Sequence, residues 1–439
     1  MNDDNEQQLR DEIAKKIEKY FAIKKRTKKF IPGKTWVQYA GGVFDHREIN
    51  ASVQVLLDGW FGLGKKADEL ERGLAEFLGT KGCILTNSGS SSNFLSVASI
   101  MSPFFPQRLE PGDEVITSAC GFPTTVNPIV THRLTPVFLD VIPDTYNINA
   151  RDLEKAYSQK TKAVMIAHTL GNPNEMDVVM EFCQKYNLLL IEDNCDAFGS
   201  EYDGKRTGSF GILATQSFYP PHHLTMGEGG AVYYNDLRFE RITRSLRDWG
   251  RSCWCRGDEK RIHGACGVRF NYIIAGRPYD HKYMFNQIGY NLKPIEPQAA
   301  MGVEQLKRMP QFMKTRSKNF QRLFSYAKKW EKFFILPRHL PKAKPCWFSF
   351  PLTIRDDAPF TRLEITLYLE ERMIQTRPLF AGNLTRQAAY KNVEYRTVGN
   401  LENSDRVLFN NFFVGIYPGL GEKEIDYIAE NISVFLKKY

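Results

Sequence analysis

Residues 163–193, AVMIAHTLGNPNEMDVVMEFCQKYNLLLIED, decide the fold. The stretch begins with an apolar run at 163–167 and ends with a second apolar run at 188–191, and a helical or loop segment separates the two. Short runs of this kind are typical of strands that are buried on both faces. Comparable runs occur at 82–85, 114–117, 136–139 and 231–234. Short buried strands that alternate with helices predict an α/β fold with a mainly parallel central sheet.

The length of the chain predicts two lobes. With 439 residues, the chain is long for one domain. We expect an N-terminal helical and basic arm at 1–38, a large domain at 39–296 and a smaller C-terminal α+β domain at 297–439. Helical spacing predicts helices at 6–22, 294–309, 311–332, 361–372 and 422–436. Residues 235–300 are rich in Arg, Gly, Cys and Tyr, and we predict an irregular, functional segment there.

The composition, 42% hydrophobic and 25% charged, is that of an ordinary globular protein. No apolar run reaches the roughly 18 residues that a membrane span needs, and the polar start MNDDNEQQLR is unlike a signal peptide. We therefore expect a cytoplasmic protein without a membrane partner. The net charge of +9 is concentrated at 24–29. No nucleic-acid motif accompanies this cluster, so a solvated segment or attraction for anionic small molecules is expected rather than a nucleic-acid partner.

Two motifs stand at predicted strand ends, where open α/β sheets bind ligands. Ser88-Gly-Ser-Ser-Ser92 joins a strand to a helix. Its small residues let backbone N–H groups approach an anion, and a Ser-rich helix cap is the alternative. Leu190-Ile-Glu-Asp-Asn-Cys-Asp196 ends an apolar strand in acidic residues. A carboxylate there could hold a protonated ring nitrogen, or it could cap a helix or lie on the surface.

A third motif, Ser217-Phe-Tyr-Pro-Pro-His-His-Leu-Thr-Met-Gly-Glu-Gly-Gly230, follows the first two. In this order the three motifs resemble the sugar aminotransferase family. Its members are pyridoxal-phosphate enzymes of the aspartate aminotransferase fold (type I), and they act on nucleotide-linked keto-sugars. The resemblance extends over about 39–411 and includes Gly59-Trp-Phe-Gly-Leu-Gly64 and Gly289-Tyr-Asn-Leu292.

The resemblance implies how a cofactor is bound in the large domain. The residues that would bind its phosphate are Gly89, Ser90 and Ser217. Phe122 would stack on the pyridine ring. Asp193 would keep the ring nitrogen protonated, so that the ring acts as an electron sink. Asn291 would reach the phosphate of a second subunit, which implies a homodimer.

Departures from the family pattern are as informative as the matches. His222 stands where the family has the lysine that tethers the cofactor, and imidazole cannot form that tether. The resemblance therefore implies that the cofactor is non-covalent, as pyridoxamine 5′-phosphate. Imidazole titrates near neutrality, so His222 could still move a proton at the cofactor C4′ atom, with Tyr219 or His223 as further candidate acids. Asp196, at the cofactor, and Phe348, at the substrate, also depart from the common pattern. A binding protein without catalysis is the alternative.

Four thiols form a candidate metal site. The first is Cys195, and three more lie within 14 residues, at Cys253, Cys255 and Cys266. Four thiolates suit tetrahedral zinc or a [2Fe–2S] cluster, and the spacing alone leaves zinc, iron–sulfur and unligated thiols open. If the strand continues past Asp193, residues 193 and 195 point the same way, roughly 7 Å apart. Any metal at Cys195 would then lie beside the cofactor.

A lysine-less branch of the family, the CDP-4-keto-6-deoxy-D-glucose 3-dehydrases, carries both the histidine and a [2Fe–2S] cluster. Resemblance to this branch implies that the four thiols bind a [2Fe–2S] cluster, with Cys266 the least certain ligand. It also implies C3 dehydration of the keto-sugar, with single electrons from a flavin or iron–sulfur reductase, to give a 3,6-dideoxy sugar of the kind found in bacterial O-antigens. Arg386 could pair with the substrate diphosphate, or be a surface or core arginine. The rival functions are the same chemistry on a TDP-linked 4-keto-2,6-dideoxyhexose, a sugar aminotransferase that uses glutamate, and a non-catalytic zinc- or nucleotide-binding module.

Overall fold

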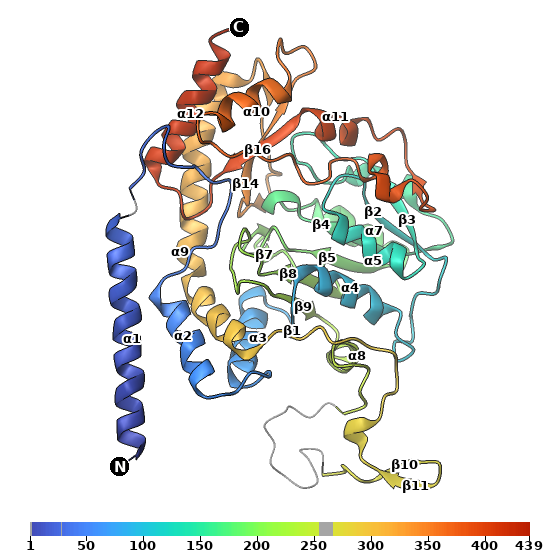
Figure 1. Ribbon diagram of the computed structural model, residues 1–439. Helices are drawn as coiled ribbons and strands as arrows, with labels where there is room; N and C mark the ends of the chain where they lie inside the picture. The colour runs from blue at the N-terminus through green and yellow to red at the C-terminus, as the bar shows by residue number, and fades with distance from the viewer. Residues whose placement is uncertain (1, 28, 254–266) are drawn as a thin grey trace.

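The computed structural model describes residues 2–27, 29–253 and 267–439. At its centre is an eight-stranded sheet in the order β1-β9-β8-β5-β4-β2-β3-β15 (Figure 1). Its strands are β1 (Gly82–Thr86), β2 (Glu114–Ser118), β3 (Thr135–Leu139), β4 (Thr161–Ala167), β5 (Leu189–Asp193), β8 (Leu213–Ser217), β9 (Gly230–Tyr234) and β15 (Arg396–Thr397). Neighbouring strands are parallel, except that β9 runs antiparallel to both β1 and β8. The predicted α/β class with a mainly parallel sheet is confirmed.

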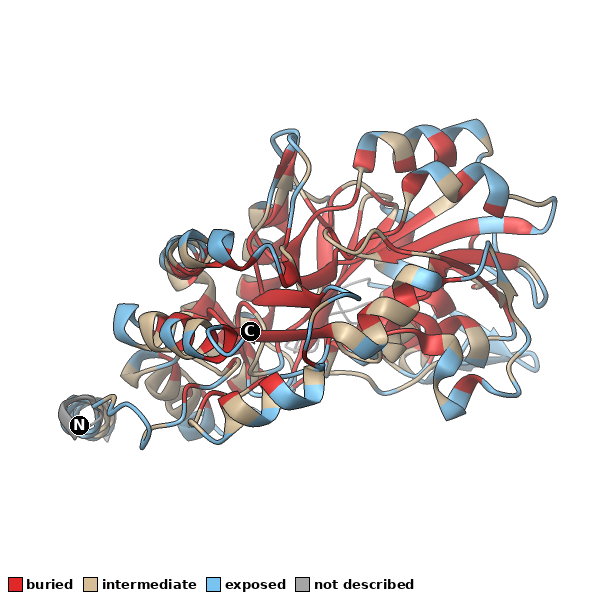
Figure 2. Ribbon diagram, turned by 90° about the horizontal axis from the view of Figure 1, so that it is seen from above, coloured by how far each residue is buried: buried red, intermediate tan, exposed pale blue. Residues whose placement is uncertain are grey.

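Apolar cores fill both faces of this sheet. In β4, neighbouring residues face opposite sides of the sheet. Met165 packs in the same core as Leu95, whereas Val164 packs in the same core as Val179 on the other face. This double burial explains why the strands read as continuous apolar runs. The covering helices turn exposed faces outward (Figure 2). They are α3 (Lys65–Leu78), α4 (Gly89–Ile100), α5 (Pro123–Thr131), α6 (Leu153–Ala156), α7 (Met176–Lys185) and α8 (Arg238–Arg247). Helix α2 (His46–Leu57) packs instead against α9 (Glu296–Ala327).

A smaller α+β lobe follows in the chain and has its own core. Its sheet has the order β12-β14-β16, and Phe350, Phe412 and Ile428 lie within its core. The elements of this part of the chain are β12 (Phe334–Ile335), β14 (Ser349–Ile354), α10 (Arg362–Glu370), α11 (Glu402–Asn410), β16 (Asn411–Gly415) and α12 (Glu422–Leu436). Short strands β6 (Glu201–Tyr202), β7 (Lys205–Arg206) and β13 (Ala343–Lys344) form a separate three-stranded sheet.

One long helix, α9 (Glu296–Ala327), joins the two lobes. We predicted two helices there, divided before residue 311, and this division is wrong. The helix continues through Pro310 because its apolar face is packed on both sides of the proline: Phe312 belongs to a large-lobe core and Phe320 to the small-lobe core. The predicted domain boundary at 296/297 therefore coincides with the start of a helix that packs first on the large lobe and then on the small one.

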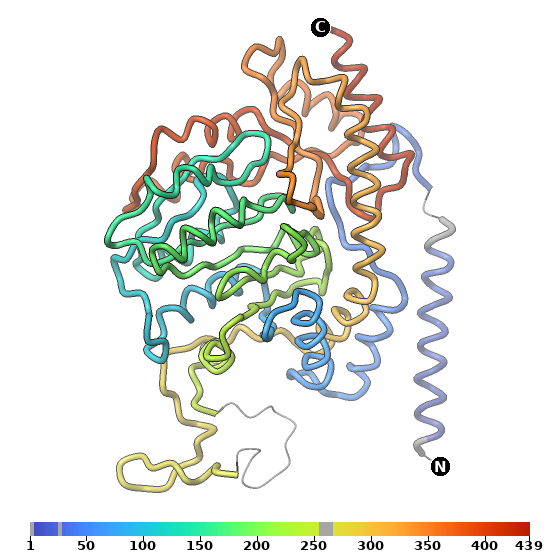
Figure 3. The backbone as a smooth tube through the Cα atoms, turned by 180° about the vertical axis from the view of Figure 1, so that it is seen from behind, coloured from blue at the N-terminus to red at the C-terminus, as the bar shows by residue number. Residues whose placement is uncertain are grey.

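Residues 235–300 contain more regular structure than we predicted. Helix α8 lies at their start, and β10 (Tyr272–Ile274) pairs with β11 (Arg277–Tyr279) in a hairpin that projects from the body (Figure 1). The N-terminal helix α1 (Asn2–Thr27) lies along the outside of the molecule (Figure 3). Arg10 ties it to the body, because its Nη1 atom donates to the Gln54 carbonyl at 3.2 Å. None of the described helices is long and apolar enough to cross a membrane.

Candidate functional site

A cavity of about 570 Å³ lies at the carboxyl ends of the parallel strands. Segments that directly follow β1, β2, β4, β5 and β8 contribute to its walls. Tyr39, Glu228 and residues of the small lobe such as Phe348 and Phe413 complete them. This is where open α/β sheets bind ligands. The residues that line it include Ser88, Gly89, Ser90, Phe122, Asp193, Cys195, Asp196, Ser217, Tyr219, His222, Glu228, Phe348, Arg377 and Phe413.

The predicted phosphate-binding residues form one end of the cavity. Ser88 caps α4, and its side chain accepts a hydrogen bond from the Ser91 N–H. Gly89 and Ser90 begin this helix at the cavity wall. Gly89 packs against Ser217 so closely that a Cβ atom on residue 89 would lie 2.4 Å from the Ser217 Cβ. A helix N-terminus flanked by serine hydroxyls is a binding site for a phosphate group.

Asp193 provides a fixed carboxylate at the end of β5. Its Oδ2 atom accepts hydrogen bonds from Asn93 Nδ2 at 2.8 Å and from Thr125 Oγ1 at 2.7 Å. Asn93 is held in turn by Thr215, whose hydroxyl donates to the Asn93 Oδ1 atom at 2.6 Å. The carboxylate is 5% exposed and lines the cavity. It is therefore oriented before any ligand arrives.

These features fit pyridoxamine 5′-phosphate. The Ser88–Ser90 turn and Ser217 suit its phosphate, and Asp193 suits a protonated ring nitrogen. Phe122 lies on the cavity wall, half exposed, and packs edge-on against Phe380 with ring centroids 5.7 Å apart. An aromatic face in that position suits stacking on a planar ring.

His222 and Asp196 lie together on the cavity wall. The His222 Nδ1 atom is 3.5 Å from Asp196 Oδ1. The imidazole ring also faces Phe348, with centroids 5.6 Å apart, and Tyr219, at 6.4 Å. Burial lowers the pKa of His222 to about 4. The same burial, with repulsion from Asp193, raises the pKa of Asp196 to about 8. A neutral imidazole can accept a proton, so His222 is suited to act as a base.

A buried arginine supports the segment that carries His222. Arg316 of α9 is 1% exposed, and it donates from Nη1 to the Phe348 carbonyl at 2.9 Å and from Nη2 to the His222 carbonyl at 3.4 Å. It therefore ties the histidine segment to the small-lobe strand. No feature of the sequence indicated this contact, because it joins residues that are 94 positions apart.

The two neighbouring histidines have different environments. The His223 Nε2 atom bonds to the Cys346 carbonyl at 2.7 Å. The residue is 3% exposed, and it is not among the described residues that line the cavity. The His223 ring is therefore held against the backbone, and its acid role stays a prediction. Tyr219 is 48% exposed and does line the cavity.

The strand geometry expected for Cys195 required the strand to continue past Asp193, and β5 ends at Asp193. Cys195 nevertheless lines the cavity, because its backbone N–H donates to Asp193 Oδ1 at 3.1 Å in the turn that follows. Cys253 is half buried. Cys255 and Cys266 lie outside the described residues. Within the described residues no group of three or more His, Cys, Asp or Glu side chains could hold a metal ion, and the predicted ligand set stays a prediction.

The remaining predicted residues lie away from the cavity. Arg386 pairs with Asp405, Nη2 to Oδ2 at 2.7 Å, and is absent from the cavity lining among the described residues. The prediction that Arg386 meets the substrate diphosphate therefore lacks structural support. Asn291 is exposed and pairs through its backbone with Asp248, and its predicted role toward a second subunit stays a prediction. Arg377 begins the stretch 377–387 that also contains Arg386, and the motif resemblance implies that this stretch helps to shape the substrate pocket. Arg377 does line the cavity.

Comparisons with known proteins agree with this geometry. Residues 43–433 match the model of the DegT/DnrJ/EryC1/StrS aminotransferase family. The chain is 44% identical to the lipopolysaccharide biosynthesis protein RfbH of Salmonella typhimurium, covering 97% of this chain and 98% of the relative. It is 45% identical to the dTDP-4-dehydro-2,6-dideoxy-D-glucose 3-dehydratase of Saccharopolyspora spinosa, covering 93% and 88%.

Among solved structures, the E. coli GDP-4-keto-6-deoxy-D-mannose-3-dehydratase with bound hydrated PLP superimposes with a TM-score of 0.80. It is 28% identical, and the match covers 90% of this chain and 99% of that one. The predicted fold of type I pyridoxal-phosphate enzymes is thereby confirmed. The chain belongs to the DegT/DnrJ/EryC1/StrS aminotransferase family.

Proposed function

We propose that this protein is a pyridoxamine-phosphate-dependent 3-dehydratase of nucleotide-linked 4-keto-6-deoxyhexoses. The observation that carries the proposal is His222, which stands in the cavity where the family pattern has its lysine. No lysine is among the described residues that line the cavity. The described cavity lining therefore offers no side-chain amine that could bind the cofactor covalently, whereas His222 offers a base for proton transfer.

In the proposed reaction, the residues that line the cavity have separate roles. The Ser88–Ser90 turn and Ser217 hold the phosphate, and Asp193 accepts the ring N–H. When bound, the cofactor supplies an amine that condenses with the C4 ketone and a ring that accepts electrons. His222 moves the proton at the C4′ atom, and Asp196 lies beside it, 3.5 Å from Nδ1. Tyr219 lines the same cavity, and we assign its phenol the role of acid for the departing C3 hydroxyl.

The saturated product requires two further electrons. We propose that Cys195, Cys253, Cys255 and Cys266 hold a [2Fe–2S] cluster that passes them singly from a flavin or iron–sulfur reductase. Cys195 supports this part of the proposal because it lines the same cavity as Asp193. A homodimer, in which Asn291 serves the partner's cofactor, completes the proposed assembly.

Two nucleotides are candidates for the substrate. The motif resemblance points to CDP-4-keto-6-deoxy-D-glucose. The 45% identity to an enzyme named for dTDP-4-dehydro-2,6-dideoxy-D-glucose favours a TDP-linked sugar. Both carry the C4 ketone and C3 hydroxyl that the chemistry needs.

The test is an anaerobic incubation of the holoenzyme with each keto-sugar, with and without a reductase and reductant. We expect loss of the C3 oxygen from one of them, and a 3-deoxy product only when electrons are supplied. Incubation with glutamate and no reductant is the control for transamination. Formation of an amino sugar in that control would contradict the proposal and would identify an aminotransferase.

A further inference from the structure

We infer that Arg377 is the diphosphate-binding residue of this cavity, which deepens the proposed function and rests on it. Arg377 is the one Lys or Arg among the described residues that line the cavity. The cradle for the cofactor phosphate is built from serine hydroxyls and a helix N-terminus instead. A cation on another wall therefore indicates a second anion.

The Arg377 guanidinium is fixed but not fully used. Its Nη1 atom donates to the Thr376 carbonyl at 2.6 Å and lies 3.9 Å from Glu370 Oε1. Its Cζ atom lies 4.5 Å from the centre of the Tyr39 ring. In the described part of the chain, no protein acceptor bonds to Nε or Nη2. Two N–H groups in a held, planar fork match the geometry of a phosphate group.

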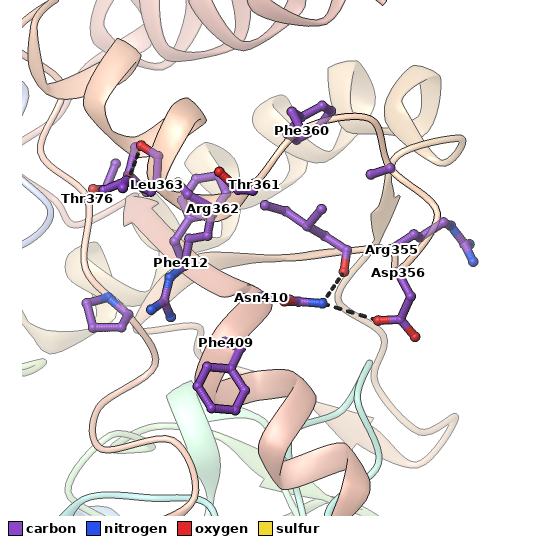
Figure 4. A pocket seen from close by; sticks show the side chains of 14 residues that line it. Arg355, Asp356, Phe360, Thr361, Arg362, Leu363, Thr376, Phe409, Asn410 and Phe412 are labelled. Carbon is purple, nitrogen blue, oxygen red and sulfur yellow. Dashed lines mark hydrogen bonds between the residues drawn. The ribbon is translucent and has the colours of Figure 1, made fainter.

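A neighbouring arginine shows the contrast. A second cavity of about 600 Å³ lies in the small lobe, and Phe412 of β16 lines it (Figure 4). Phe413, the next residue of the same strand, lines the first cavity instead. Arg362 lies in the second cavity, and its Nη1 atom donates to the Leu408 carbonyl at 2.6 Å and the Asn411 carbonyl at 3.1 Å. Among the described residues, Arg362, like Arg377, bonds to backbone carbonyls through Nη1 alone. The two arginines differ in place: Arg377 lines the cavity that also contains Asp193 and His222, whereas Arg362 lines the second cavity.

The partial exposure of the Arg377 side chain favours a diphosphate, rather than a carboxylate, as the anion that it binds. Its side chain is 46% exposed, so the anion that it binds lies at the cavity edge. A nucleotide sugar places its sugar inside and its nucleoside outside, and the diphosphate that joins them crosses this edge. The carboxylate of an amino acid that reacts with the cofactor would lie inside instead.

The experiment measures binding rather than turnover. Holoenzyme loaded with pyridoxamine phosphate is titrated calorimetrically with CDP, TDP, GDP and L-glutamate, for wild type, Arg377→Met, Arg377→Lys and Arg406→Met. Arg406 is the matched control: it lies in the same lobe, pairs with Asp356 at 2.7 Å and is absent from the described cavity lining. We expect Arg377→Met to lower the affinity for the preferred nucleoside diphosphate about 10-fold to 100-fold. The affinity of Arg377→Lys should lie between those of Arg377→Met and wild type, and the affinity of Arg406→Met should equal that of wild type.

Two results would overturn the inference. Nucleoside diphosphate affinity that is unchanged in Arg377→Met would remove Arg377 from the site, and a loss confined to L-glutamate would make it a carboxylate-binding residue. Cofactor affinity and melting temperature, measured on each variant, separate misfolding from lost contacts, and Arg377→Lys serves if the methionine variant does not fold. Dehydration by the same wild-type preparation is scored separately. An active wild type with unchanged Arg377→Met binding rejects this inference alone, whereas an inactive wild type rejects the proposed function.

Discussion

At the residue scale, the exchange of a lysine for His222 changes what the cavity can do. A lysine amine would bind the cofactor covalently, whereas an imidazole cannot, and in its neutral form it can accept a proton. Asp196, 3.5 Å from the imidazole, departs from the family pattern together with it. The two substitutions are neighbours in space, although 26 positions separate them in the chain.

We predict that His222→Asn abolishes turnover, by roughly 10²-fold to 10⁴-fold, because the variant removes the base and keeps a polar side chain of similar size. Cofactor binding, followed by absorbance, should remain. The adjacent His223→Asn is the matched control. Its ring bonds to the Cys346 carbonyl outside the cavity, so we expect a lower melting temperature with the chemistry retained. Equal losses of turnover in the two variants would contradict the assignment of His222 as the base.

At the element scale, the start of α4 depends on a residue without a side chain. A methyl group at position 89 would lie 2.4 Å from the Ser217 Cβ, so one of the two elements must shift. We predict that Gly89→Ala weakens pyridoxamine phosphate binding at least about 10-fold, measured by fluorescence titration. An unaffected variant would show that this turn does not hold the phosphate.

The end of β5 depends on a buried carboxylate next to Asp193. Glu192 accepts backbone N–H bonds from Gly208 at 2.7 Å, Phe210 at 2.6 Å and Gly211 at 2.7 Å, and it bonds to His168 Nε2 at 2.9 Å. We predict that Glu192→Gln lowers the free energy of unfolding by about 2–3 kcal/mol, since an amide cannot accept all these bonds. Denaturant unfolding measures the change. A variant as stable as wild type would show that the N–H groups find other acceptors.

At the scale of the whole molecule, the prediction concerns metal content. Anaerobically purified protein should contain about two iron atoms and acid-labile sulfide per chain, as a [2Fe–2S] cluster requires. Its visible absorption should bleach with dithionite and give a one-electron EPR signal. Cys195→Ser should lose this signal, whereas Cys183→Ser, at a buried thiol packed in the core, should keep it. Stoichiometric zinc without iron would reject the proposed electron relay. The proposed dehydration would then be tested separately, by the anaerobic incubation with keto-sugars.

The sequence by itself determined the local features of this protein. Strands buried on both faces are visible in the sequence as apolar runs, and α12 was predicted with its observed bounds. The cofactor motifs could be recognised because each is contiguous in the chain. The phosphate turn, Asp193 and His222 therefore reach the same cavity as expected.

The tertiary structure decided what depends on distant segments. Pro310 was expected to end a helix, but packing against two lobes holds α9 together across it. His223 and Arg386 were expected at the site, but the Cys346 carbonyl and Asp405 hold them elsewhere. The contacts of Arg316 with the Phe348 and His222 carbonyls were missed for the same reason. Burial and hydrogen-bond partners are set by residues far along the chain, and those contacts decide whether a side chain of the right chemistry faces a ligand or its own backbone.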